Sequence, residues 1–295
     1  MKPFRISVPA SSGNVGPGFD SMGLAESLYL SLEVKESDQW EFSSPSFPGT
    51  SYEDHFIYQI AKQTAERHNR QLPSCSIAET SDIPLARGLG SSASAILAGI
   101  ELANQLCGLS LSSAAKLRYG AEIEGHPDNI APALFGGLVI STVTKEEIDW
   151  IRIPVLDVDL VLYIPEVELK TEKARQVLPE DYPRSHASTA SGISNIVIAA
   201  LLTGDFNLAG RMMERDLFHE PYRSPLIPNY EEIRREAKKL GAYGTVISGA
   251  GPAMLSFVPK GAGQAVAVQM QNLLGDYQVK SLDIDVDGLT VEALY

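Results

Sequence analysis

Apolar residues follow two different periods along this chain. Short alternating or fully apolar runs predict β-strands at Arg5–Pro9, Tyr29–Lys35, Gly137–Val143, Asp159–Ile164, Thr245–Ser248, Met254–Val258 and Gln278–Val286. Segments with apolar residues three and four positions apart predict helices at Phe56–His68, Ser92–Cys107, Ser112–Glu122, Ser188–Leu202, Tyr230–Leu240 and Gly263–Leu274. No repeat of 20–50 residues and no low-complexity segment is present. The pattern predicts an α+β protein.

A charged stretch without a strong period, "TKEEIDWIRIP", follows the predicted strand Gly137–Val143. Such a stretch is typical of a connection between domains. At 295 residues with 44% hydrophobic content, the chain can bury one large core or two modest ones. We therefore predict an N-terminal domain over residues 1–154 and a C-terminal domain over residues 155–295.

Charge and cysteine content limit the partners and the cellular compartment. The formal net charge is −13 and the 24 basic residues are scattered, which argues against nucleic acid or an anionic membrane and favours a small molecule. The start, "MKPFRISVPASSGN", lacks an apolar signal-peptide core, and we expect no segment long enough to span a bilayer. Cys75 and Cys107 show no metal-ligand spacing. We expect a cytoplasmic protein with reduced thiols.

The stretch "RGLGSSASA" places two glycines and several serines at the start of a predicted helix. A helix start has unpaired N–H groups and a partial positive charge, and glycine lets an anion approach the backbone closely. A dinucleotide fingerprint would need a preceding apolar strand and an acidic residue about 20 positions later, which are missing. A Walker A loop would need Lys after Gly90, where Ser91 stands. Taken alone, the stretch is therefore either a phosphate-binding loop of another kind or an ordinary helix start capped by serine.

Two further glycine-rich loops, "PASSGNVGPGFDSMG" and "SGAGPAMLSF", flank this stretch in the sequence. In this order the three loops resemble the signature motifs of the GHMP kinases, the galactose, homoserine, mevalonate and phosphomevalonate kinase superfamily. The middle loop carries the pattern P-x-x-x-G-L-G-S-S-A intact. Within the superfamily, "VPASSGNVGPGFDSMGLA", "EIEGHPDNIAPALFGG", "TEKARQVLP" and "EPYRSPLIP" are similar to segments of the homoserine kinase family.

This resemblance implies a fold and an activity. The expected fold is the two-domain GHMP kinase fold, with an N-terminal ribosomal-protein-S5-domain-2-like domain that binds ATP and a C-terminal ferredoxin-like α/β domain. The implied reaction is ATP-dependent phosphorylation of the L-homoserine hydroxyl to O-phospho-L-homoserine on the route to threonine, commonly by a homodimer. Two alternatives stay open, namely another small-molecule kinase of mevalonate or shikimate type, and a nucleotide-binding regulator without catalysis.

The resemblance also assigns the ATP and magnesium sites. The predicted ATP-binding segment comprises Pro84, Leu85, Ala86, Arg87, Gly88, Leu89, Gly90, Ser91, Ser92, Ala93 and Ser94. The Ser92 hydroxyl and the Glu122 carboxylate resemble the family's ligands for Mg²⁺, which prefers oxygen. Glu124 is the rival ligand, and it lies on the opposite face of a helix from Glu122. Many relatives have Asn in place of His55 near the adenine, so nucleotide preference stays open.

A second set of residues is similar to the family's substrate site. The predicted substrate-binding residues are Asn14, Asp20, His126, Asn129, Thr171, Arg175 and Arg223. In this assignment Arg175 and Arg223 hold the substrate carboxylate, because a guanidinium can donate two parallel hydrogen bonds to it. Asp20 meets the ammonium group, Asn14 orients the substrate, and Thr171 adds a hydroxyl contact.

The predicted catalytic residues are Asn129, Ser92 and Glu122, and none of them is an obvious base. Asn129 occupies the position of the catalytic aspartate of mevalonate-type kinases, and Ser11 that of their lysine. An amide cannot accept a proton at pH 7. We therefore expect positioning and charge neutralisation to carry the rate, with Asp128 as the alternative base.

Overall fold

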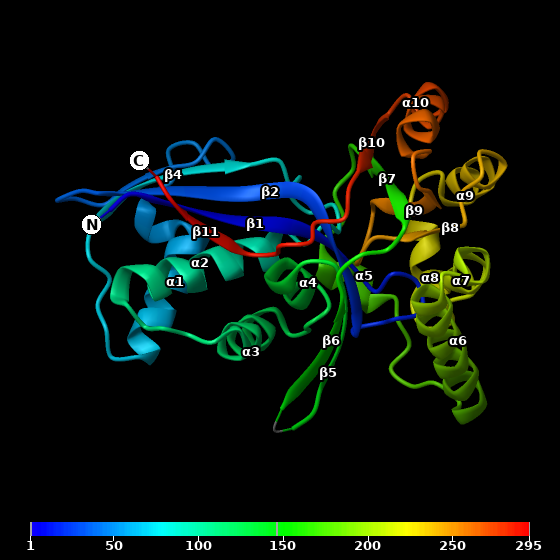
Figure 1. Cartoon of the computed structure of the whole chain (residues 1–295), viewed down its shortest axis with the longest axis horizontal. Helices are drawn as coiled ribbons and strands as arrows, with labels where there is room; N and C mark the ends of the chain where they lie inside the picture. The colour runs from blue at the N-terminus through cyan, green and yellow to red at the C-terminus, as the bar shows by residue number, and fades with distance from the viewer. Residues whose placement is uncertain (1, 146, 295) are drawn as a thin grey trace.

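Two β-sheets organise the chain, and the computed structural model describes residues 2–145 and 147–294. The first sheet runs in the order β11-β1-β2-β4-β3, and β5 pairs with both β2 and β6. Its strands are β1 (Phe4–Gly13), β2 (Met22–Glu36), β3 (Glu41–Ser43), β4 (Cys75–Ser81), β5 (Leu138–Val143), β6 (Ile148–Ile153) and β11 (Thr290–Ala293). Four helices pack below it in Figure 1, namely α1 (Phe56–Arg67), α2 (Ser91–Cys107), α3 (Ser113–Glu124) and α4 (Ile130–Phe135).

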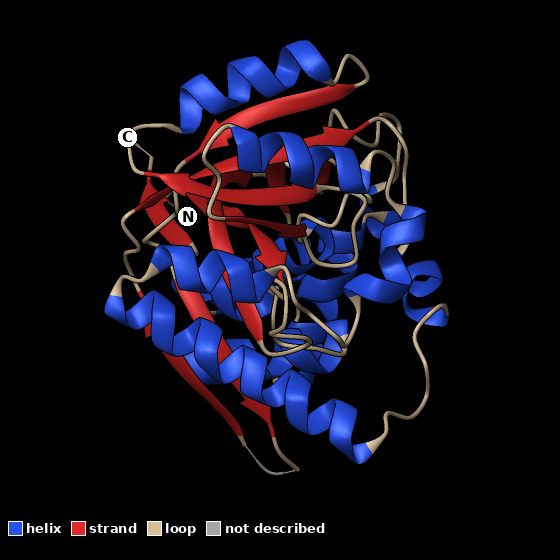
Figure 2. Cartoon of the chain, turned by 90° about the vertical axis from the view of Figure 1, so that its right-hand side faces the viewer, coloured by secondary structure: helices blue, strands red, loops and turns tan. Residues whose placement is uncertain are grey.

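The second sheet is antiparallel and runs in the order β10-β7-β9-β8. Its strands are β7 (Val158–Pro165), β8 (Gly244–Ile247), β9 (Met254–Pro259) and β10 (Tyr277–Leu282). The accompanying helices are α5 (Thr171–Gln176), α6 (Arg184–Thr203), α7 (Phe206–Met213), α8 (Glu220–Arg223), α9 (Tyr230–Lys239) and α10 (Gly263–Leu273). Figure 2 shows helices lying in front of the strands, on the side away from the first sheet. The mixed α and β content predicted from the sequence is confirmed.

Successive side chains of β7 pack alternately into two hydrophobic cores, and this explains how the second sheet joins the rest of the protein. Leu160, Leu162 and Ile164 belong to the main hydrophobic core, which also contains β1, β2 and α2. Val161 and Tyr163 belong to a second core with residues of α9 and α10. Successive side chains of a strand point to opposite faces, so both faces of this sheet are buried. The two sheets therefore share one continuous core on one side of β7.

Two segments differ from the sequence-based prediction. The charged stretch expected to be a linker forms β6, which pairs antiparallel with β5 over Leu138↔Ile153 to Val143↔Ile148. The C-terminal residues, predicted as part of a domain spanning 155–295, return to the first sheet, where β11 pairs with β1. In Figure 1 this red segment runs back from β10 until β11 lies beside β1, with Ala293 opposite Phe4. The last strand of the predicted C-terminal range is therefore part of the first sheet.

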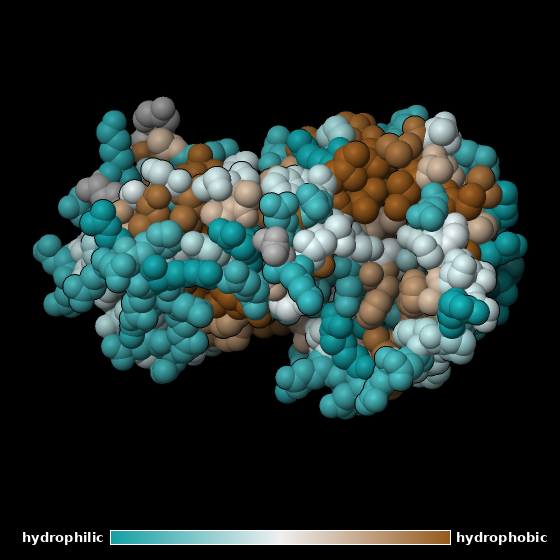
Figure 3. Space-filling model, turned by 90° about the horizontal axis from the view of Figure 1, so that it is seen from below, coloured by the Kyte–Doolittle hydropathy of each residue, from teal (hydrophilic) through white to brown (hydrophobic). Residues whose placement is uncertain are grey.

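Helix α6 also departs from expectation, because it is long and apolar enough by length and composition to cross a membrane. Only 28% of its most apolar 18-residue segment is buried. Val197, Ala200 and Leu201 nevertheless pack into the main core, while Ile196 and Leu202 are exposed. Seen from below in Figure 3, hydrophobic residues gather on the half of the molecule that holds the second sheet. One side of α6 therefore packs into the core, and the other side is exposed.

Candidate active site

The three glycine-rich loops converge where the two sheets meet. The Ser11 N–H donates to the Leu89 carbonyl at 3.2 Å, and the Gly249 N–H donates to the Gly13 carbonyl at 3.0 Å. Gly88 and Gly90 have φ angles of 77° and 66°, in the left-handed region that favours glycine. A Cβ on Gly88 would overlap the Ser248 carbonyl, and one on Gly90 would overlap the Ser11 hydroxyl. These glycines therefore let the loops touch.

A cavity of about 420 Å³ opens beside the start of α2, where no side chain caps the first N–H groups of that helix. All seven predicted substrate-binding residues line it, and so does the middle glycine-rich loop. Its lining comprises Asn14, Asp20, Ala86, Gly88, Leu89, Gly90, Ser91, Ser92, Glu124, His126, Asp128, Asn129, Leu169, Lys170, Thr171, Glu172, Arg175, Arg223, Gly249 and Ala250. One cavity thus contains an anion-binding helix start and a group of charged side chains.

The remaining residues of the predicted ATP segment support the loop from behind. The Arg87 guanidinium donates to the carbonyls of Leu85, Pro165 and Glu166, which ties the loop to the end of β7. The Ser94 hydroxyl donates to the Pro9 carbonyl, and Ala93 is fully buried. Pro84 lies outside the cavity lining, and Leu85 lines a second cavity described below. These side chains therefore hold the loop in place.

The carboxylate beside Ser92 is Glu124, whereas Glu122, the predicted magnesium ligand, lies elsewhere. The Ser92 hydroxyl donates to Glu124 Oε2 at 2.8 Å. Glu122 instead accepts a hydrogen bond from the Arg67 guanidinium of α1 at 2.6 Å, away from the cavity. Positions two apart on a helix face opposite sides, so only one of the two carboxylates can point at Ser92. The phase of α3 places Glu124, its last residue, at the cavity.

Asp20 and Arg175 form an ion pair across the cavity. Arg175 donates to both carboxylate oxygens of Asp20, at 2.7 and 3.2 Å. The side chains are 36% and 38% exposed, so solvent reaches the pair. Asn14 positions Asp20, because its Oδ1 accepts the Asp20 N–H at 3.0 Å while its Nδ2 donates to the Gly249 carbonyl at 2.8 Å. The sequence assigned these residues to one substrate site, and the fold brings them together.

Arg223 is almost completely buried and has no carboxylate partner in the described part of the chain. It donates to the carbonyls of Ala174 and Gly249 and to His219 Nδ1. Burial, followed by the positive charge of Arg175, lowers the pKa of Arg223 to about 10, so it stays charged near neutrality. A buried cation with only neutral partners is costly unless an anion completes its environment.

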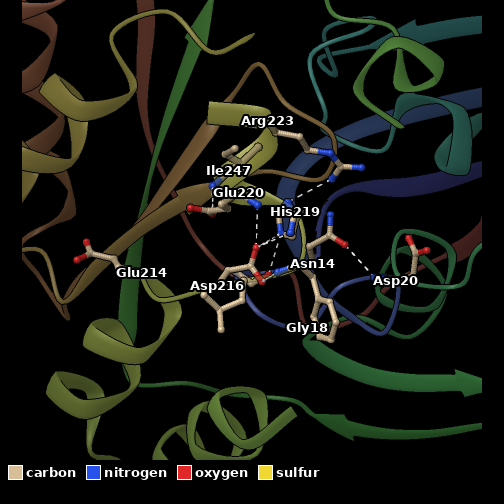
Figure 4. A network of polar contacts seen from close by, with 12 residues as sticks. Asn14, Gly18, Asp20, Glu214, Asp216, His219, Glu220, Arg223 and Ile247 are labelled. Atoms are coloured by element: carbon tan, nitrogen blue, oxygen red, sulfur yellow. Dashed lines mark hydrogen bonds and ion pairs between the residues drawn. The ribbon is translucent and has the colours of Figure 1, made fainter. Parts of the chain in front are cut away.

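His219 holds Arg223 in place, and sequence analysis missed it (Figure 4). Its Nε2 lies 2.8 Å from the Gly16 carbonyl and its Nδ1 faces Arg223, so Nε2 carries the proton and Nδ1 accepts. Burial lowers the pKa of His219, which fits a neutral ring. Asp216 accepts the N–H groups of His219 and Glu220 at the start of α8. The signal for His219 was its position four residues before Arg223, one helical turn.

The "HPDN" segment follows α3 and supplies three more cavity residues. His126 Nδ1 lies 2.5 Å from Asp128 Oδ1. Burial opposes protonation of His126, but the hydrogen bond and charge of Asp128 together outweigh it and raise the pKa of His126. The Asn129 side-chain amide donates to the carbonyl and the hydroxyl of Ser11, at 2.9 and 3.0 Å. Its Nδ2 is therefore engaged with β1, and Oδ1 is its remaining polar atom.

A second, apolar cavity of about 270 Å³ adjoins the first through Ser91 and Ser92. Leu30, Phe47, Phe56, Leu85 and other largely apolar residues line it, together with His55 and Glu79. His55 Nε2 lies 3.0 Å from Glu79 Oε2, and both side chains are 4% exposed. The His55 ring stacks on Phe42 with 3.8 Å between centroids. A flat apolar group could therefore bind beside the helix start.

Comparisons with known proteins agree with this geometry. Residues 55–137 match the GHMP kinases N terminal domain, and residues 197–276 match the GHMP kinases C terminal domain. A curated homoserine kinase of Oceanobacillus iheyensis is 58% identical over 294 residues, which cover 99% of this chain and 100% of that protein. The homoserine kinase of Halalkalibacterium halodurans is 48% identical over 293 residues, with 98% and 95% covered.

A solved structure of homoserine kinase from Cytophaga hutchinsonii aligns with a TM-score of 0.85 at 28% identity, covering 99% of this chain and 98% of that one. The predicted two-domain GHMP kinase fold is thus confirmed. The high identity over the whole length also favours homoserine kinases over the mevalonate-type alternative. The chain belongs to the GHMP kinase superfamily and, within it, to the homoserine kinase family.

Proposed function

We propose that this protein transfers the γ-phosphoryl group of ATP to the hydroxyl of L-homoserine, giving O-phospho-L-homoserine and ADP. One observation carries the proposal: a single cavity presents a helix start for phosphate beside an acidic group and two guanidinium groups for an amino acid. Phosphoryl transfer needs mainly that two reactants are positioned and that phosphate charge is neutralised. The cavity residues are suited to both tasks.

The charged groups match a zwitterionic substrate. Homoserine carries a carboxylate and an ammonium group, and the Asp20–Arg175 pair offers the complementary charges at 2.7 Å. On binding, the substrate ammonium would replace Arg175 as the partner of Asp20, while the substrate carboxylate would bind Arg175 and Arg223. That exchange gives Arg223 the anionic partner that the free protein does not supply. Thr171 and His126 also line the cavity and complete the substrate site.

The donors at the start of α2 suit a magnesium ion. Two neighbouring ligands of an octahedral Mg²⁺ with bonds of about 2.0–2.1 Å lie roughly 2.9 Å apart. The Ser92 hydroxyl and Glu124 carboxylate oxygens are 2.8 Å apart, so both fit one ion. When bound there, Mg²⁺ would neutralise negative charge on the β- and γ-phosphates. The N–H groups of the Gly88–Ser91 segment would bind phosphate oxygens directly.

No group in the cavity is an obvious general base, and we propose that catalysis does without one. Asn129 has no proton equilibrium near neutrality, and its amide is engaged with Ser11. The hydroxyl proton would pass to the transferred phosphoryl group or to water. Asp128 is the alternative base, although His126 already occupies one of its oxygens at 2.5 Å. Loss of a limb near neutrality from the kcat–pH profile in Asp128→Asn would favour that alternative.

The second cavity is proposed to bind the adenine of ATP. It is apolar, it adjoins the phosphate-binding loop through Ser91 and Ser92, and its wall contains the His55 ring, which stacks on Phe42 behind it. Flat heteroaromatic rings favour such surroundings. His55 replaces the Asn of many relatives, so the nucleotide preference requires a direct comparison of ATP with GTP.

We further propose a homodimer in the cytoplasm. The exposed apolar side chains Ile196 and Leu202 of α6, 43% and 59% exposed, support an interface on this helix. Both cysteines are free thiols, as expected in a reducing compartment. Sedimentation velocity would test the dimer, and Ile196→Lys should convert it to a monomer.

The test of the reaction is an ADP-release assay with four acceptors, namely L-homoserine, 4-hydroxybutyrate, mevalonate and shikimate. Turnover is expected with ATP, Mg²⁺ and homoserine, and 4-hydroxybutyrate should react far more slowly because it lacks the ammonium group. Faster turnover of mevalonate or shikimate would contradict the assignment. ATP binding without turnover of any acceptor would instead favour a nucleotide-binding regulator. The Ser92→Ala variant is the control for contaminating kinases.

A further inference from the structure

Glu26 is a buried carboxyl group that the proposed reaction does not use. It lies in β2 with 0% exposure, outside the lining of the cavity. Its Oε1 contacts the Ser12 hydroxyl of the first glycine-rich loop. Ser12 Oγ lies 2.6 Å from Ser248 Oγ of the third loop, and Ser248 Oγ lies 2.7 Å from the Gly88 carbonyl of the second. A single chain of contacts thus links all three loops, and we name it the Glu26 chain.

The number of available protons determines which group donates in each hydrogen bond of the Glu26 chain. Three hydrogen bonds need three protons, and the hydroxyls of Ser12 and Ser248 supply two. The Gly88 carbonyl can only accept, so Ser248 donates to it, and Ser12 must then donate to Ser248. The remaining bond, between Glu26 and Ser12, requires a proton on the carboxyl group. We propose that Glu26 is a neutral carboxylic acid that donates to Ser12 and, through the Glu26 chain, positions the phosphate-binding loop.

The environment of Glu26 supports the neutral form. Burial raises its pKa to about 7, and the contact with Ser12 only partly opposes this shift. Its Oε2 has no hydrogen-bond partner in the described part of the chain. An ionised, half-paired carboxylate in such a place is costly, whereas a neutral carbonyl oxygen costs far less. The proton count along the Glu26 chain and the burial of Glu26 therefore both indicate a neutral carboxyl group.

No described charged group faces Glu26 from the neighbouring elements. Ser12 approaches from β1 and Ser248 from the loop after β8. The residues of β5 opposite the start of β2 are Ile140, Val139 and Leu138. The segment after β10 approaches through Ile284. The next residue, Asp285, directs its carboxylate to the Tyr29 hydroxyl and to the N–H groups of Asp287 and Gly288.

The Gly88 carbonyl connects the Glu26 chain to the proposed ATP site. In a trans peptide, the carbonyl of one residue and the N–H of the next point in opposite directions. When Ser248 holds the Gly88 carbonyl, the Leu89 N–H points away from Ser248, and Leu89 lines the cavity. That N–H donates to no other residue in the described ranges. Its place in the cavity wall suits a phosphate oxygen, so Glu26 is a positioning residue for ATP.

The proposal predicts a pH dependence with a definite sign. Below a pH of about 7 Glu26 is protonated and all three hydrogen bonds form. Above it the carboxylate can only accept, the Glu26 chain has one proton too few, and one of its bonds must break. The affinity for ATP should therefore fall as the pH rises through this region.

Glu26→Gln tests the proposal, because the side-chain amide is neutral at every pH and keeps an N–H donor for Ser12. At pH 6 we expect Glu26→Gln to bind ATP within about threefold of the unmodified protein and to lose the alkaline decline in affinity. Glu26→Ala and Ser248→Ala should each weaken ATP binding about tenfold. The proposal would be overturned if Glu26→Gln and Glu26→Ala lost ATP affinity equally and Glu26→Gln kept the fall in affinity at alkaline pH.

Affinity is measured by titration calorimetry with ATP and no acceptor, so the result does not depend on homoserine being the substrate. Because the proposal rests on the proposed ATP site, failure of that function would appear separately, as no ATP binding by the unmodified protein. Infrared spectroscopy gives a direct readout even where a variant folds poorly. The spectrum of the unmodified protein minus that of Glu26→Gln at pH 6 should contain the C=O band of a protonated carboxyl group. Absence of that band would also overturn the proposal.

Discussion

Glu124 and Glu122 offer a matched pair of carboxylates on one helix. Glu124 accepts the Ser92 hydroxyl, whereas Glu122 accepts Arg67 on the far side of α3. We predict that Glu124→Gln lowers kcat by about two orders of magnitude or more, because phosphate charge is then poorly neutralised. Glu122→Gln should stay within about threefold, since exposed ion pairs contribute little. Steady-state kinetics at saturating Mg²⁺ checks this, and the reverse order would restore Glu122 as the ligand.

Asp20 is expected to read the ammonium group of the substrate. Removing its charge in Asp20→Asn should cost roughly 2–5 kcal/mol in kcat/KM for homoserine, because the substrate ammonium group then loses its anionic partner. The ratio of kcat/KM for homoserine to that for 4-hydroxybutyrate should narrow. Glu172→Gln is the control, since Glu172 lines the same cavity. An unchanged ratio in Asp20→Asn would show that Asp20 does not recognise this group.

These two sites show what the sequence could and could not predict. Asn14, Asp20, Arg175 and the glycine-rich loops carry a recognisable local pattern, and they do line one cavity. The choice between Glu122 and Glu124 depended on the rotation of α3 about its axis, which α1 and α2 determine by packing. His219 was missed because its role depends on Gly16, 203 positions away in the sequence. Local patterns do not contain such distant contacts.

The start of α2 requires glycine for two reasons. Its backbone has a positive φ angle, and it lies too close to β1 for a side chain. Gly90 and Gly108, at the two ends of α2, have φ angles of 66° and 60°. A Cβ at Gly108 would meet nothing within 4 Å, whereas one at Gly90 would overlap the Ser11 hydroxyl. We predict that Gly108→Ala costs about 1 kcal/mol of stability from strain alone.

Gly90→Ala should cost more stability and should also lower kcat/KM for ATP by about tenfold or more, because the phosphate-binding loop must shift. Urea unfolding and steady-state kinetics on both variants test this. Equal losses of stability, with normal kinetics for Gly90→Ala, would mean that the contact with Ser11 is unimportant.

Strands with apolar alternation were predictable, and strands defined by their partners were not. β7 and β9 are buried on both faces and read as apolar runs. β6 is mostly exposed, with no buried residue, and its pairing with the edge of β5 is what makes it a strand. The strand predicted at Gln278–Val286 is shorter in the structure, because β10 ends at Leu282, and Asp285 beyond it is only 6% exposed. Pairing and burial there depend on residues far away in the chain.

Asp285 joins the C-terminal segment to the first sheet and should therefore affect the stability of the whole protein. Its carboxylate accepts the Tyr29 hydroxyl at 2.8 Å and the Gly288 N–H at 2.7 Å. We predict that Asp285→Ala lowers the free energy of unfolding by about 2–4 kcal/mol, because buried donors lose their acceptor. Asp283→Ala is the control, since its side chain is 81% exposed and should cost less than about 0.5 kcal/mol. Equal free energies of unfolding for Asp285→Ala and Asp283→Ala, measured with urea, would contradict this role of Asp285.

The pairing of β11 with β1 has a consequence for synthesis on the ribosome. β1 leaves the ribosome long before its outer partner, residues 290–293. Until those residues emerge, β1 presents an open edge that can pair with another chain. A premature stop codon before residue 290 would release chains that keep this edge exposed. Such chains are expected to aggregate instead of forming a smaller folded protein.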